Sequence, residues 1–106
     1  MKLHLLKDAR LDLADASSYY GSHSQAAYRN FMAAVRAATQ RIGEMPHIGR
    51  RLTFSTRQYL ICGFPYTLLY AAKPDRILIV ALTHHSRNPD RWLHRALRVH
   101  EPRAEY

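Results

Sequence analysis

Two histidines and an arginine lie close together near the end of the chain, in the stretch ALTHHSRNPDRW. Imidazole groups can move protons near neutral pH, and a guanidinium can hold a phosphate through two parallel hydrogen bonds. RNA cleavage needs a group that activates the 2′-hydroxyl, a positive charge at the scissile phosphate and an acid for the leaving oxygen. The candidate residues for such a site are Arg57, His84, His85 and Arg87.

A structural interpretation of the same residues competes with the catalytic one. Successive side chains on a strand point to opposite faces, so His84 and His85 would not share one cleft if a strand continues through them. One histidine would then cap the sheet or bond to a backbone carbonyl, and Arg87 would anchor the last helix. Tyr66 and Tyr70 could supply a phenol or a stacking surface. The histidines lack a convincing metal-ligand spacing, so neither a metal nor a cofactor is expected.

The first half of the chain predicts a short strand and two helices that position these groups. Residues 1–7 alternate weakly and indicate a strand, and apolar residues at helical spacing follow them. Asp8 suits the N-cap of the first helix, and Gly21 suits its end. Ser22 and Gln25 form the S-x-x-Q capping pattern that would open the second helix. Because few residues separate the two helices, they should pair as an antiparallel hairpin.

The second half predicts three strands and a short final helix. A turn-rich connector, PHIGRRLTFST, precedes three apolar segments, RQYLICGF, YTLLYAA and RILIVALTH. The KPDR turn should join the last two segments as a hairpin. Residues 77–82 are apolar on both faces, which is typical of a central strand. Phe64-Pro65-Tyr66 indicates a bend or bulge between strands, and Asn88 and Pro89 indicate the start of the last helix.

These elements predict one α+β domain over residues 1–106, with residues 101–106 as a loose tail. An N-terminal strand and an antiparallel helical hairpin would pack on a mainly antiparallel four-stranded sheet, closed by a short C-terminal helix.

The charge of the chain is strongly positive. Sixteen Lys and Arg against eight Asp and Glu give a net charge of +8, and only Lys2, Lys7 and Lys73 are lysines. Arginine forks suit phosphates and carboxylates, so nucleic acid or an acidic protein segment is the expected partner. A basic surface that is only solvated is the alternative.

Cysteine content and hydropathy set further expectations. Cys62 is the single cysteine, which excludes a disulfide within the chain, and its apolar neighbours predict a small core residue. No signal peptide is visible, and no apolar stretch approaches the roughly 20 residues that span a bilayer. We therefore expect a cytoplasmic protein with no membrane contact.

Four separated segments carry a family resemblance: DARLDLADASSYYGSHSQAAYRNF, RIGEMPHIGRR, FPYTLLY and ALTHHSRNPDRWLHR. In this order they resemble successive parts of the RelE/ParE superfamily of toxins from bacterial type II toxin–antitoxin systems. The closing His-x-x-Arg-x-Pro-x-x-Trp looks typical of the ParE, or plasmid stabilisation, branch. Together the segments cover nearly the whole chain.

The resemblance implies a growth-inhibiting toxin that is neutralised by an acidic cognate antitoxin. The antitoxin would wrap the toxin and bind operator DNA, so the toxin would meet that DNA only indirectly. ParE-like members poison DNA gyrase, and the expected function is therefore inhibition of gyrase without catalysis. A RelE-type endoribonuclease that cleaves mRNA on the ribosome is the first alternative. A non-toxic module that only binds the antitoxin is the second.

Candidate contact residues follow from charge, exposure and the resemblance. The candidates for contact with the target are Arg87, Arg91, Trp92, Arg95 and Arg98. The candidates for contact with the antitoxin are Tyr19, Tyr28, Arg29 and Arg36. Tyr20 and Phe31 are expected in the core, and Asp12 and Asp15 on the polar side of the first helix.

Overall fold

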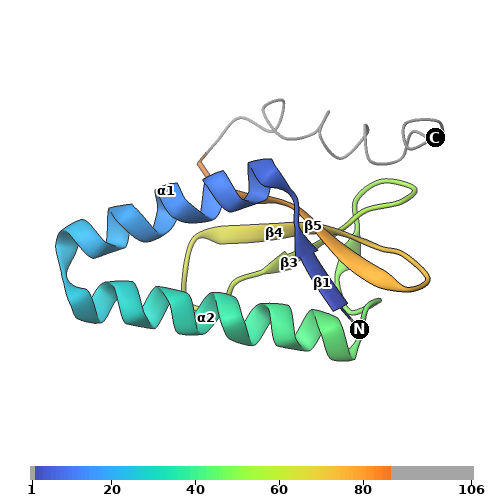
Figure 1. Ribbon diagram of the computed structural model, residues 1–106, viewed down its shortest axis with the longest axis horizontal. Helices are drawn as coiled ribbons and strands as arrows, with labels where there is room; N and C mark the ends of the chain where they lie inside the picture. The colour runs from blue at the N-terminus through green and yellow to red at the C-terminus, as the bar shows by residue number, and fades with distance from the viewer. Residues whose placement is uncertain (1, 87–106) are drawn as a thin grey trace.

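The computed structural model describes residues 2–86, which form two helices and a five-stranded sheet (Figure 1). In chain order the elements are β1 (Lys2–Leu5), α1 (Lys7–His23), α2 (Gln25–Glu44), β2 (Arg50–Arg51), β3 (Arg57–Leu60), β4 (Tyr66–Ala72) and β5 (Arg76–His84). The expected C-terminal helix and tail lie outside the described residues.

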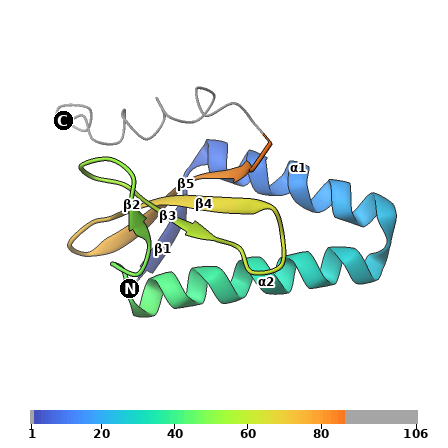
Figure 2. The ribbon, with the colours of Figure 1, turned by 180° about the vertical axis from the view of Figure 1, so that it is seen from behind.

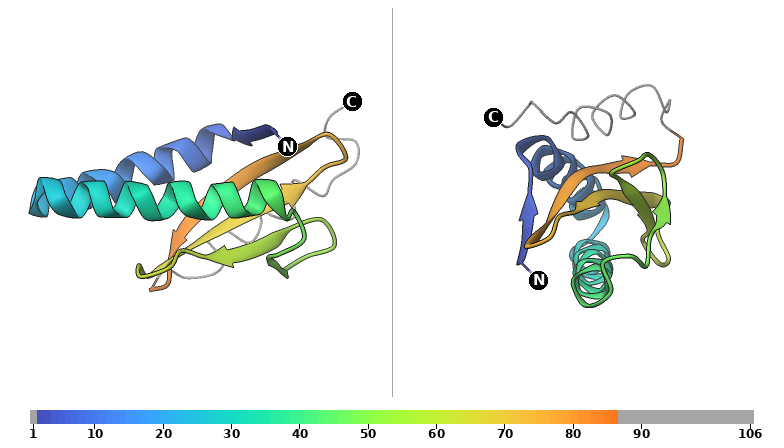
Figure 3. Two further views of the ribbon diagram at one scale, coloured as in Figure 1. Left: turned by 90° about the horizontal axis from the view of Figure 1, so that it is seen from below. Right: turned by 90° about the vertical axis from the view of Figure 1, so that its right-hand side faces the viewer.

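The strands are ordered β1-β5-β4-β3-β2, and every pairing is antiparallel except the parallel pairing of β1 with β5. The α+β architecture, the helical hairpin and the central position of β5 are therefore as predicted. Figure 3 shows both helices on one side of the sheet. The KPDR turn joins β4 to β5, with the Lys73 N–H donating to the Arg76 carbonyl at 2.8 Å.

The fifth strand, β2, was not predicted. Arg50 pairs with Gln58 and Arg51 with Arg57, within the segment expected to be only a turn-rich connector. Side-chain hydrogen bonds close the loop that follows: the hydroxyls of Thr53 and Thr56 lie 2.6 Å apart, and Thr56 is fully buried. Polar residues that satisfy one another stabilise this hairpin, and apolar alternation does not reveal it.

One serine divides the two helices. Ser24 has an extended backbone, ends α1, and accepts a hydrogen bond from the Ala27 N–H at 2.9 Å as the N-cap of α2. The predicted boundary at Gly21 and Ser22 was therefore wrong by two residues. The N-cap of α1 is Leu6 without a side-chain bond, and Asp8 lies in the first turn instead, where a carboxylate favours the positive helix end.

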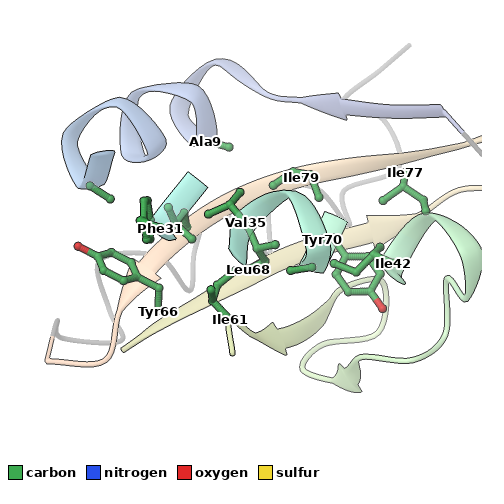
Figure 4. Close-up of a cluster of buried hydrophobic side chains, with 13 residues drawn as sticks. Ala9, Phe31, Val35, Ile42, Ile61, Tyr66, Leu68, Tyr70, Ile77 and Ile79 are labelled. Carbon is green, nitrogen blue, oxygen red and sulfur yellow. The ribbon is translucent and has the colours of Figure 1, made fainter. Parts of the chain in front are cut away.

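The main core lies between the helices and the sheet (Figure 4). From α2, Phe31 and Ile42 are completely buried, and they pack against Leu68, Tyr70 and side chains of β5. A second, smaller cluster on the other face consists of Leu69, Val80 and Ala81, with Leu6 and Leu52 packed against it. The β2–β3 loop thus covers part of the sheet face that the helices leave open.

A β-bulge changes the direction of side chains in β5. Tyr70 pairs with Ile79 but Leu69 pairs with Ala81, so Val80 is the extra residue. Ile77 and Ile79 join the helix-side core, Val80 and Ala81 the opposite cluster, and Leu82 the helix-side core again. The bulge therefore decides which face each residue after Val80 occupies.

The expectation for Cys62 was wrong, because this side chain is exposed. Strand β3 ends at Leu60, and the chain bends between β3 and β4 through Gly63, which has a φ of 85°. The bend at Phe64-Pro65 agrees with the sequence prediction. Cys62 therefore lies on a turn outside the core.

Candidate functional site

His84, the last residue of β5, faces the helix side of the sheet. Its Nδ1 accepts a hydrogen bond from the Ser86 N–H at 3.0 Å, and the Ser86 hydroxyl lies 2.8 Å from the same nitrogen. The imidazole packs edge-on against Tyr66, with ring centroids 5.0 Å apart. Since Nδ1 accepts, the neutral ring carries its proton on Nε2 and can donate from that atom.

His85 points elsewhere. Its Nε2 lies 3.0 Å from the Thr67 hydroxyl, and its backbone N–H donates to the Pro65 carbonyl at 2.9 Å. Thr67 alternates with Tyr66 and Leu68, both in the helix-side core, so it faces the other side of the sheet. The two adjacent histidines are thus held by different partners on opposite faces.

Arg57 lies far from His84. Arg57 pairs with Tyr70 and His84 with Tyr66, on the two sides of β4. The register places them about 13 Å apart along the strand direction and about 10 Å apart across the sheet. The Nη1 of Arg57 donates to the carbonyls of Gly49 at 2.8 Å and His47 at 3.3 Å. The residues proposed for RNA cleavage are therefore not brought together, and Arg87 lies outside the described residues.

A groove of about 350 Å³ opens beside His84, between α1 and the end of β5. We call it the β5-end groove, and it is lined by Asp12, Asp15, Ala16, Tyr19, Tyr66, Leu82, His84 and Ser86. Asp12 was expected on the polar side of α1, but its Oδ2 accepts a hydrogen bond from the Leu82 N–H at 3.1 Å. The groove therefore combines two carboxylates with an imidazole and two phenols.

Asp12 contacts a part of β5 that lacks a neighbouring strand. Strand β1 pairs with β5 only as far as Leu5 opposite Ile79. Within residues 2–86, no strand pairs with the β1 side of β5 beyond that point. The Asp12 carboxylate takes the Leu82 N–H at this edge in place of a neighbouring strand, and sequence reasoning missed this contact because it depends on where β1 ends.

The four residues predicted to contact an antitoxin are all exposed on the helical hairpin. Tyr19 is 56% exposed and Tyr28 41%, and Arg29 and Arg36 are exposed as well. The two arginines are seven positions apart, so they share one face of α2. Tyr19 also lines the β5-end groove, which makes that groove continuous with the exposed side of α1.

The aromatic residues expected in the core are there. Tyr20 stacks on Phe31 with ring centroids 4.7 Å apart, and Phe64 packs edge-on against both rings. Burial raises the pKa of Tyr20 above its ordinary value of 10.0, and the neighbouring Tyr19 adds to the shift. Tyr20 therefore stays a neutral phenol and acts as packing material.

Other kinds of site are not found in the described part of the chain. Residues 2–86 contain no group of three or more His, Cys, Asp or Glu side chains that could hold a metal ion. Neither α1 nor α2 is long and apolar enough to cross a bilayer. The candidate target contacts Arg91, Trp92, Arg95 and Arg98 lie outside the described residues.

Comparison with known proteins agrees with this architecture. A helical hairpin on a mainly antiparallel sheet defines a small α+β domain. The family model for the ParE toxin of the type II toxin–antitoxin system parDE matches residues 3–89. The chain therefore belongs to the ParE toxin family.

A solved structure gives the same fold. It is titled "Chromosomal ParDE TA system from P. aeruginosa" and matches with a TM-score of 0.58 at 17% sequence identity. The match covers 79% of this chain and 95% of the other chain. At this identity the likeness concerns the fold alone. No curated protein matches the sequence.

Proposed function

We propose that this ParE-family toxin arrests growth by inhibiting DNA gyrase and that it is not itself a nuclease. The observation that carries the proposal is the separation of Arg57 from His84, since acid–base catalysis at one phosphate needs its groups within hydrogen-bond reach of the same substrate. His84 and His85 have structural partners on opposite faces, which also favours a non-catalytic role.

Brief induction of the toxin alone in a bacterial host tests this proposal. A DNA-damage reporter and the integrity of transcripts are recorded in the same cells. We expect a strong reporter signal with intact transcripts, and purified toxin should increase cleaved DNA in a gyrase reaction. Rapid transcript cleavage without DNA damage would favour the endoribonuclease instead. A folded protein without any growth effect would favour the non-toxic binding module.

We further propose that an acidic cognate antitoxin neutralises the toxin by wrapping the helical hairpin and the β5-end groove at the edge of the sheet. Arg29 and Arg36 offer two guanidinium groups on one face of α2, where carboxylates of the antitoxin can pair with them. The β5-end groove carries Asp12 and Asp15, so it suits a neutral or basic portion of the same segment. Operator DNA would then be bound by the antitoxin.

Binding of the antitoxin encoded beside the toxin tests this second proposal. The variants Arg29→Ala and Arg36→Ala should weaken binding several-fold and make it less sensitive to salt, because a charge pair is lost. Tyr19→Ala should weaken binding with little change in salt sensitivity. Unchanged affinity in all three variants would place the antitoxin on another surface.

A further inference from the structure

A second cluster of basic side chains lies at the opposite end of β4 from His84. Figure 2 shows the β2–β3 loop and the β4–β5 turn at one end of the sheet. Between them lies a pocket of about 230 Å³, lined by His47, Arg51, Phe54, Ser55, Arg57, Ala72 and Lys73. We call it the cationic pocket.

The lining of the cationic pocket favours an anion. Arg51, Arg57 and Lys73 are charged, His47 can become charged, and none of the residues from 2 to 86 that line the pocket carries a carboxylate. The acidic residue that lies nearest to Lys73 in the sequence is Asp75, and it is exposed on the turn between β4 and β5. Such a concentration of positive charge at a concave surface raises the local potential and attracts phosphate groups.

Both arginines are already oriented by the backbone. The Nη1 of Arg51 donates to the Phe54 carbonyl at 2.8 Å, and the Nη1 of Arg57 donates to the Gly49 carbonyl at 2.8 Å. A guanidinium has five N–H donors in a rigid fork, so these bonds leave others for a ligand. Less side-chain entropy is then lost when an anion binds.

An unpartnered hydroxyl is the second observation. The Oγ of Ser55 is buried and has no hydrogen-bond partner among the described residues, although its backbone N–H bonds to the Thr53 hydroxyl. Leaving a buried polar atom without a partner is unfavourable, and such groups often mark a ligand that completes the site. A χ1 rotation is enough for a serine to present its hydroxyl to a phosphate oxygen.

An exposed aromatic ring beside the pocket narrows the class of anion. Phe54 is 78% exposed at the tip of the β2–β3 loop and lines the same pocket. Aromatic side chains next to cationic grooves stack on the bases of single-stranded nucleic acids. A free phosphate or a phosphorylated side chain would make no comparable use of this ring.

From this arrangement we propose that the cationic pocket binds a backbone phosphate of a single-stranded nucleic acid, with a neighbouring base stacked on Phe54. The phosphate takes hydrogen bonds from Arg51, Arg57 and Ser55 and lies near the ammonium of Lys73. The residues of this contact differ from those proposed for antitoxin binding on the helical hairpin and in the β5-end groove. They also differ from the candidate contacts with gyrase, which are Arg87, Arg91, Trp92, Arg95 and Arg98.

Fluorescence anisotropy with the purified full chain tests the proposal. The probe is a labelled DNA strand of about 12 nucleotides, titrated at about 50 mM and about 200 mM salt. A duplex and an RNA strand of the same sequence serve as comparisons. We expect the single strands to bind more tightly than the duplex, and the RNA arm shows whether DNA or RNA is preferred.

Three variants and one matched control make the test specific. Lys73→Ala should weaken binding several-fold and lower the slope of log affinity against log salt by about one. The control Lys7→Ala removes the same charge from α1 and should leave both the affinity and the salt slope nearly unchanged. Phe54→Ala should weaken binding to the single strand and leave duplex binding unchanged. Ser55→Ala should weaken binding without lowering the melting temperature, because the Ser55 hydroxyl makes no hydrogen bond within the described part of the chain.

Two outcomes would overturn the proposal. Equal losses of affinity in Lys7→Ala and Lys73→Ala would mean that the whole basic surface attracts nucleic acid without a defined site. Absence of binding at the lower salt concentration, with the protein folded, would mean that the pocket does not recognise nucleic acid. Gyrase inhibition can succeed or fail independently of either result.

Discussion

The hydroxyl of Tyr70 joins two backbone groups of the segment between α2 and β2. It accepts a hydrogen bond from the Gly49 N–H at 2.9 Å and donates to the Pro46 carbonyl at 2.8 Å. Tyr70 is fully buried in the centre of β4, so this phenol anchors an irregular segment to the sheet. The same segment supplies the carbonyls that orient Arg57.

Removing this hydroxyl should destabilise the fold. Tyr70→Phe keeps the ring but leaves a backbone donor and a backbone acceptor without partners, which should lower the free energy of unfolding by about 1–3 kcal/mol. Denaturant unfolding measures the change. The control Tyr28→Phe alters a partly exposed phenol on α2 and should stay within about 0.5 kcal/mol of the parent protein. A Tyr70→Phe variant as stable as its control would show that the bridge contributes nothing.

The same phenol should make stability sensitive to alkaline pH. Burial raises the pKa of Tyr70 above its ordinary value of 10.0, and the Gly49 hydrogen bond and the charge of Arg57 partly oppose that shift. Because the folded pKa is the higher one, the contribution is complete below pH 10.0 and declines as the pH rises above it. The stability difference between the parent protein and Tyr70→Phe should therefore shrink in unfolding curves measured from about pH 8 to about pH 11. A stability difference between the two proteins that grows with pH would contradict this prediction.

Two glycines should respond in opposite directions to an added methyl group. At Gly49 a Cβ would lie 2.7 Å from the Tyr70 hydroxyl and 2.8 Å from the Gln58 carbonyl oxygen, so Gly49→Ala should cost about 1–3 kcal/mol. At Gly21, inside α1, the nearest atom would be 3.7 Å away on Tyr28. Gly21→Ala should therefore stabilise the helix by about 0.5–1 kcal/mol. Thermal melts of both variants test these two predictions. A Gly49→Ala variant that is more stable than the parent protein would contradict the close contact of this position with the Tyr70 hydroxyl and the Gln58 carbonyl oxygen.

The bond between Asp12 and Leu82 should protect one amide. Asp12→Ala removes the acceptor for the Leu82 N–H, so that amide should exchange faster with solvent and the fold should lose about 1–3 kcal/mol. Asp12→Asn keeps an acceptor oxygen and should lose less. Hydrogen exchange followed by NMR measures the effect, and Asp15→Ala is the control one turn away. Unchanged exchange at Leu82 in Asp12→Ala would show that another group protects this amide.

The closing histidine of β5 should be dispensable for toxicity if the toxin inhibits gyrase. We expect His84→Ala to arrest growth to the same extent as the parent protein, provided that circular dichroism shows it to be folded. A nuclease that used this imidazole as its acid or base would lose its activity. Loss of growth arrest in a folded His84→Ala variant would therefore favour the ribonuclease over the gyrase inhibitor.

Much of the fold follows from periodicity in the sequence. The helical stripe that includes Phe31 and Ile42, and the apolar run from Ile77 to Leu82, led to the correct hairpin and the correct central strand. Boundaries were less accurate, because Ser22 and Ser24 are both good N-caps and only packing selects between them. Cys62 was misplaced because an apolar run does not reveal that the strand ends at Leu60.

Predicting the candidate site from the sequence would have required contacts between residues that are distant along the chain. Strand alternation correctly separated His84 from His85, since that geometry involves neighbouring residues only. The distance from Arg57 to His84 depends on two strand registers, and the role of Asp12 depends on where β1 stops. The cationic pocket combines a loop and a turn that are distant in sequence, so composition indicated its charge but not its place.

The exposed position of Cys62 has a practical consequence. This thiol is the only one in the chain, and it lies on the turn between β3 and β4, where it lines neither the cationic pocket nor the β5-end groove. Oxidation of Cys62 can therefore join two copies of the chain through one disulfide bond, and no larger disulfide-linked assembly can form. The same thiol accepts one fluorophore at a known position, so a labelled toxin can report binding at either surface without any engineered cysteine.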